Sequence, residues 1–279
     1  MELLKIVKKD NSMELSKLKD FAKFELPEQG AIYKSISLST ERKINNFLDK
    51  LNNNSNYEIL LRGTNFEYIT EINSFEGPEL LKRVFIVGDK AKRFFDNQLR
   101  EVFDNNFLEN ELKSFKDIDV ATILGKISDD YYKRNTELRA LIHFLKEKQG
   151  YSMRSDSVMS TTSSLNSALD FVNGGYIIVL FENQKHIFNA EDLKTIVGEE
   201  ESSLIDCEKE YMISQAIFPN KIIGIINPEQ KFIINPWLIK KLETGDEIFD
   251  FDIPVDQTFF DQYRKEIGYQ NEAYDNFRI

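Results

Sequence analysis

Residues 206–215 spell DCEKEYMISQ, which places two carboxylates, Glu208 and Glu210, directly before an apolar run. In an extended strand, residues two apart point to the same face, about 6.6 Å from each other. The two glutamates would share a face, with Lys209 on the other. Because two like charges this close repel each other, the pattern favours contact with a cation, a hydroxyl-rich ligand or a reacting centre. Glu-x-Glu occurs twice more in this charged chain, so a solvated strand edge is the alternative for the pair taken alone.

Two other polar stretches stand at the ends of short apolar runs that favour β-strands. LLRGT places Arg62 at the end of the first, and VMSTT places Ser160, Thr161 and Thr162 at the end of the second. Taken separately, the arginine could form a strand-end salt bridge and the hydroxyls could line a polar edge. An arginine, a Ser-Thr-Thr and a Glu-x-Glu, each at a strand boundary and in that order, indicate a shared site.

In these motifs the sequence resembles the mono-ADP-ribosyltransferases of the Arg–Ser–Glu type, a family that includes bacterial toxins and vertebrate surface enzymes. The motifs cover about residues 57 to 227. The stretch STTSSLNSALDF is similar to the loop of the toxin branch, in which an aromatic residue eleven positions after the serine stacks on nicotinamide. Phe171 occupies that position.

The resemblance implies NAD as a substrate and a role for each matched residue. Arg62 would clamp phosphate with its planar fork of donors, and the backbone of Gly63 would pair with the nicotinamide carboxamide. Ser160 would hold Glu210 in place, and Thr161 would belong to the same NAD-binding set. Glu210 would accept from the ribose 2′-hydroxyl and stabilise the positive charge that develops as nicotinamide leaves.

Glu208 would act on the acceptor, since in this family Glu-x-Glu accompanies arginine targets. A carboxylate beside the acceptor can orient a guanidinium and accept its proton. The expected activity is therefore transfer of ADP-ribose from NAD to a protein arginine. The alternatives are an NAD glycohydrolase of the same fold, which gives the ribose to water, and a catalytically inactive acidic protein-binding module.

Several positions depart from the family pattern. Val158 stands where an aromatic residue is usual, and Thr162 stands where serine is commoner. Ile205 replaces an aromatic residue that the toxin branch often carries before the first glutamate. A second phosphate-binding arginine is expected after the serine, but that stretch contains none, so Arg154 or Arg139 would have to substitute.

Composition narrows the class of partner. The net charge is −11 and the pI about 4.9, which argues against nucleic acid and against anionic membrane surfaces as partners. One cysteine excludes an intramolecular disulfide, and two histidines leave no zinc pattern, so no metal is expected. We expect a soluble protein without a cleaved signal peptide. The toxin-like features imply a bacterial effector that acts on a host protein in the host cytosol.

The elements that would position these residues belong to an α+β fold. The periodicity predicts a helix over 38–51, a charged helical lobe or insertion at about 78–150, and one or two helical turns over 164–171. The lobe has two possible roles: it could stabilise the domain, or it could dock the substrate protein. His143 in the lobe is expected to be a packed core residue. Strands are predicted at 57–63, 157–162, 176–182, 193–198, 210–214, 222–227 and 231–235.

The whole chain, 1–279, is expected to form a single ADP-ribosyltransferase domain with a C-terminal tail from about residue 237. The resemblance implies that the N-terminal helices and the lobe pack on a β core that is split into two sheets.

Overall fold

The computed structural model describes part of the chain, in twelve groups of residues. They are 38–64, 84–85, 88–89, 104–116, 118–149, 158–172, 175–198, 210–214, 217–226, 232–235, 238 and 241–242.

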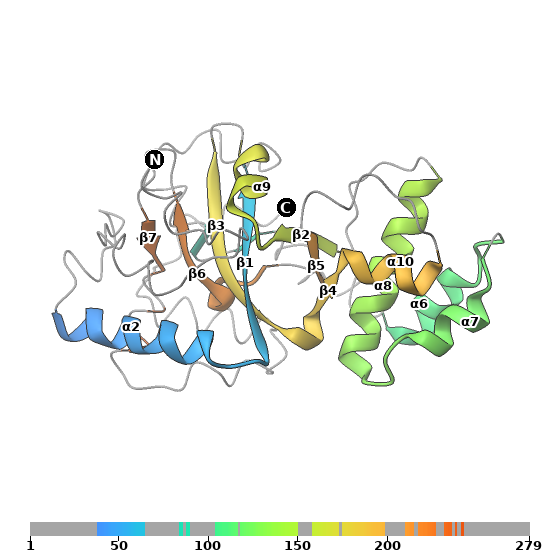
Figure 1. Ribbon diagram of the computed structural model, residues 1–279, viewed down its shortest axis with the longest axis horizontal. Coiled ribbons are helices and arrows are strands. Elements are labelled where there is room, and N and C mark those ends of the chain that lie inside the picture. Colours follow the sequence, from blue (N-terminus) through green and yellow to red (C-terminus); the bar gives the residue numbers. More distant parts are fainter. Residues whose placement is uncertain are drawn as a thin grey trace, which may run out of the picture.

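The fold is a mixed α+β structure built on an antiparallel sheet (Figure 1). Its seven described strands lie in the order β4-β5-β2-β1-β3-β6-β7. The strands are β1 Tyr57–Thr64, β2 Val158–Thr162, β3 Tyr176–Asn183, β4 Ile187–Asn189, β5 Glu210–Ser214, β6 Ile222–Ile226 and β7 Phe232–Ile234. The helices are α2 Leu38–Asn52, α6 Asn105–Leu112, α7 Val120–Lys126, α8 Tyr131–Lys148, α9 Leu165–Asp170 and α10 Ala190–Val197, with the 3₁₀ turns η3 Gln184–His186 and η4 Pro219–Lys221.

The predicted split into two sheets is not seen, because β1 and β2 still pair and so join all the described strands. Their pairing, however, consists of one position, Leu61 opposite Thr162. By contrast, β1 pairs with β3 along all eight of its residues. The sheet therefore has a narrow junction between a three-stranded part, β4-β5-β2, and a four-stranded part, β1-β3-β6-β7.

Six of the seven predicted strands are confirmed with small shifts at their ends. The prediction of a strand over 193–198 is wrong, because these residues lie in and just after helix α10. Leu193 and Ile196 recur at helical spacing and are buried. The Asn189 side chain accepts from the backbone N–H of Glu191 at the start of the helix, and Gly198, with a φ of 81°, follows its end.

On one face of the sheet, one set of helices covers the four-stranded part and another set covers the three-stranded part. On the four-stranded part, α2 and α9 pack on alternate residues of β1 and β3, including Leu61 and Val179. On the three-stranded part, α8 and its neighbouring helices pack on Val158 and Met212. The opposite face carries a third cluster, with Leu60, Met159 and Ile213 among its members.

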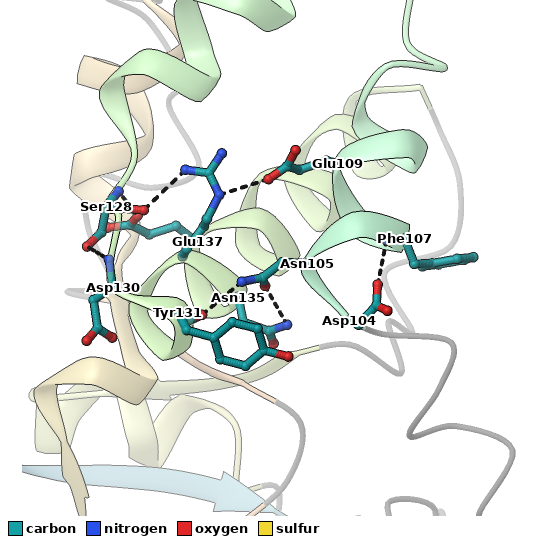
Figure 2. A network of polar contacts seen from close by, with 10 residues as sticks. Asp104, Asn105, Phe107, Glu109, Ser128, Asp130, Tyr131, Asn135 and Glu137 are labelled. Carbon is teal, nitrogen blue, oxygen red and sulfur yellow. Dashed lines mark hydrogen bonds and ion pairs between the residues drawn. The ribbon is translucent and has the colours of Figure 1, made fainter.

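The predicted helical lobe consists, in its described part, of α6, α7 and α8. Side-chain hydrogen bonds join α6 and α8 (Figure 2): Asn135 Nδ2 donates to Asn105 Oδ1 at 2.9 Å, and Arg134 Nε pairs with Glu109 at 2.9 Å. The backbone N–H of Ser128 donates to the carboxylate of Glu137 at 2.7 Å and fixes the turn that precedes α8. His143 is buried, as predicted.

Candidate functional site

Arg62 lies at the narrow junction between β1 and β2. Its Nη1 donates to the backbone carbonyl of Ser160 at 2.7 Å, and its Nε donates to Asp89 Oδ2 at 2.7 Å. The side chain of Arg62 is 16% exposed, whereas that of Asp89 is fully buried. The structure thus brings the predicted arginine to the predicted Ser-Thr-Thr strand, 98 positions along the chain.

Glu210 lies on the next strand, diagonally opposite Ser160. In the β2–β5 ladder Thr162 faces Glu210, and Ser160 faces Met212. Directly opposed residues share a face, so Ser160 and Glu210 are diagonal neighbours on one face, a separation of about 7–8 Å that a glutamate side chain can span. Ser160 is exposed and Glu210 is half-buried.

Gly63 lies on the same face as these residues, and Arg62 lies on the opposite one. Leu61 faces Thr162 across the junction, and alternation along β1 puts Gly63 with Leu61. Arg62 is joined to this group of residues through the backbone carbonyl of Ser160, at the point where the β1–β2 ladder has narrowed to one pair.

The polar stretch after β2 caps helix α9. The hydroxyl of Thr162 accepts from the backbone N–H of Ser164 at 2.9 Å, and the hydroxyl of Ser164 accepts from the backbone N–H of Ser167 at 3.2 Å. The motif STTSS therefore ends a strand and starts a helix within a few residues. Helix α9 crosses β1 and ends at Asp170, and the residue that follows, Phe171, is 57% exposed.

Gly63 allows this crossing. A Cβ at position 63 would lie 2.1 Å from the carbonyl oxygen of Ala168 and 3.1 Å from the Cβ of Phe171. The close approach that requires glycine here is thus to the chain's own helix α9. The same packing brings the Cβ of Phe171 close to Gly63, and these are the two residues that the resemblance assigns to nicotinamide.

Thr161 and Tyr211 stiffen the β2–β5 pair from the other face. The Thr161 hydroxyl donates to the backbone carbonyl of Tyr211 at 2.8 Å. Burial raises the pKa of the Tyr211 phenol, the nearby Glu58 carboxylate raises it further, and a hydrogen bond with Ser163 opposes the rise. Thr161 therefore supports the strand that carries Glu210, a role that its buried position explains.

Three of the residues named from the sequence, Glu208, Arg154 and Ile205, lie outside the described residues. Arg139, the other candidate for a second phosphate contact, is buried in α8, and its Nε donates to Asn135 at 2.6 Å. Burial lowers the pKa of its guanidinium to about 10. Its contact belongs to the polar network of the lobe.

Sequence reasoning missed Asp89, which the structure puts in direct contact with Arg62. The signal that could have located it is Gly88-Asp89, a dipeptide typical of turns, inside a stretch predicted as helical. The role of Asp89 as the counter-ion of Arg62 depends on tertiary contacts, which no local sequence pattern reveals.

The sequence matches no protein-family model and no curated protein. Among the described residues, no group of three or more His, Cys, Asp or Glu side chains could hold a metal ion. No helix in the described ranges is long and apolar enough to cross a bilayer.

Proposed function

We propose that this chain is an NAD-dependent mono-ADP-ribosyltransferase, which transfers ADP-ribose from NAD to a protein arginine and releases nicotinamide. The observation that carries the proposal is the meeting of three distant motifs at one junction. Arg62 contacts Ser160 directly, and Glu210 lies diagonally across from Ser160 on the adjacent strand. These are the residue types that the family resemblance matched, in the same order along the chain.

The arrangement suits cleavage of the bond between nicotinamide and ribose. As that bond breaks, nicotinamide leaves with the electron pair and the ribose gains positive charge. Glu210, half-buried on β5, supplies a fixed negative charge for the ribose. The guanidinium of Arg62 binds phosphate, and Phe171, which is exposed and has its Cβ close to Gly63, offers an aromatic ring for stacking.

Transfer needs an acceptor as well as a donor. A nitrogen of the target guanidinium forms the new bond to the ribose carbon and loses one proton. Glu208, two residues before Glu210, is the group proposed to take that proton. The acidic character of the chain, with a net charge of −11, favours association with a basic target segment.

An NAD glycohydrolase is the second candidate. Of the described residues that support the proposal, Arg62 and Glu210 act on the dinucleotide and Ser160 holds Glu210 in place, and water could accept the ribose without Glu208. The reaction product separates the two activities. The purified chain would be incubated with NAD labelled on its adenine ring and a cell lysate.

Protein-bound label that mass spectrometry assigns to arginine supports the transferase. Free ADP-ribose alone supports the glycohydrolase. If NAD stays intact and the chain does not bind it at millimolar concentration, both are contradicted, and the acidic binding module takes their place.

A further inference from the structure

Asp89 is held in place by hydrogen bonds of its own backbone N–H and carbonyl groups. Its N–H donates to the carbonyl of Ile217 at 2.9 Å, and its carbonyl accepts from the N–H of Ile217 at 3.0 Å. Gly88 precedes it with a φ of 78°, a conformation that glycine adopts without strain, and its N–H donates to the carbonyl of Val84. The position of the Asp89 carboxylate is therefore set by the fold before any ligand binds.

The carboxylate is fully buried and meets Arg62 at 2.7 Å. A buried carboxylate loses its hydration and needs a close charged partner in its place. An N–H donor that carries charge forms a shorter and stronger hydrogen bond with such an acceptor than a neutral donor does. With Nε on Asp89 and Nη1 on the Ser160 carbonyl, two contacts fix the plane of the guanidinium.

We propose that Asp89 is the positioning residue for Arg62: it holds the guanidinium in the orientation in which it binds the pyrophosphate of NAD. This inference rests on the proposed function. A guanidinium held by two contacts loses less conformational freedom when phosphate binds, so the fixed orientation strengthens binding. Asp89 acts through Arg62 and does not itself touch the dinucleotide.

If Asp89 had a purely neutralising role, its removal would change NAD affinity in the opposite direction. If Asp89 did no more than cancel the charge of Arg62, its removal would leave a stronger positive charge for the pyrophosphate and would tighten NAD binding. The direction of the change in NAD affinity therefore decides between positioning and neutralisation.

The test is a double-mutant cycle on the NAD dissociation constant, measured by calorimetry for the full chain. Asp89→Ala and Arg62→Ala should each weaken binding by roughly tenfold to a hundredfold, the range of a charge-assisted contact. The double variant should bind no more than about twofold weaker than Arg62→Ala, because Asp89 has no route to NAD without Arg62. Asp89→Asn, which keeps an oxygen acceptor for Nε, should recover part of the lost affinity.

Glu182→Ala is the matched control for loss of stability. Glu182 is also a buried carboxylate, paired with Lys221 at 2.9 Å, but it lies four residues from Ile178, the β3 partner of Arg62. It should lower the melting temperature and leave NAD affinity unchanged. If Asp89→Ala does not fold, the same double-mutant cycle can be measured with Asp89→Asn, with Arg62→Ala and with the variant that combines them.

Unchanged or tighter NAD binding in the Asp89 variants, additive losses in the double variant, or an equal loss in Glu182→Ala would each overturn the inference while the proposed function stands. Absence of NAD binding by the wild-type chain would contradict the proposed function and this inference together.

Discussion

The guanidinium of Arg62 touches two groups that are far apart in the sequence, Asp89 and the carbonyl of Ser160. Sequence reasoning could name Arg62 and Ser160, because each stands in a polar stretch that ends a short apolar run. It could not name Asp89, because the burial of that carboxylate depends on a backbone bridge to Ile217, 128 positions further along the chain.

Gly63→Ala tests the crossing of α9 over β1. The added methyl would lie 2.1 Å from the Ala168 carbonyl oxygen, a backbone atom that cannot turn aside. We expect a loss of about 1–3 kcal/mol in the free energy of unfolding, the usual cost of overpacking, and a displaced Phe171. Urea denaturation measures the first effect.

Gly125→Ala is the matched control, because a Cβ there meets nothing within 4 Å. In the last turn of helix α7 this change should be neutral or stabilise by no more than about 0.5–1 kcal/mol. Equal effects of the two substitutions would contradict the close packing at Gly63.

Glu208→Gln tests the role assigned to the first glutamate. The amide keeps the size of the side chain and accepts a hydrogen bond, but it cannot take a proton from the acceptor. Modification of arginine should fall while nicotinamide release from NAD continues at an appreciable rate. Label on protein and free nicotinamide are to be measured in the same reaction, and full arginine labelling by this variant would refute the assignment.

Among the elements, β5 and α10 show what a local pattern can and cannot predict. The strand at 210–214 was predicted correctly, because its apolar run is short and follows charged residues. The strand predicted at 193–198 is a helix, because the decisive signals lie before it: the cap at Asn189 and the acidic first turn of Glu191 and Asp192. The segment 193–198 contains neither the cap nor the acidic turn, so its apolar run alone could not be distinguished from a strand.

The start of β1 carries a carboxylate whose burial makes stability depend on pH. Burial raises the pKa of Glu58, and a hydrogen bond from Gln184 opposes the rise. Because the folded state binds this proton more tightly than the unfolded state, stability falls as pH rises from about 4.5 through the raised value. Glu58→Gln should therefore raise the melting temperature at pH 7 relative to the wild type and have less effect near pH 4. A gain that is equal at both pH values would contradict this origin.

On the scale of the whole molecule, one core cluster joins the helical lobe to the sheet. It contains Leu138 and Leu141 of α8 together with Val158 of β2 and Met212 of β5. The lobe therefore packs on the two strands that carry Ser160 and Glu210, which favours a stabilising role for it.

Leu138→Ala tests whether lobe and sheet unfold together. Leu138 is fully buried, so its truncation should cost about 2–5 kcal/mol. We expect one cooperative transition at a lower denaturant concentration, with far-ultraviolet circular dichroism and aromatic fluorescence coinciding. Asn110→Ala, at an exposed position of α6, is the control and should change stability by no more than about 0.5 kcal/mol. Two separate transitions would show that the lobe is an independent unit.

We propose that the junction of β1, β2 and β5 cleaves NAD, with Glu210 as the residue that stabilises the developing charge. The most direct measurement is the rate of nicotinamide release from NAD by the wild-type chain and by Glu210→Gln, with folding of the variant verified by its melting temperature. We predict measurable release by the wild type and a loss of about 10²–10³-fold or more in the variant, the scale of one charge-stabilising group. Release by a folded Glu210→Gln chain at the wild-type rate, or none by the wild type, would contradict the account.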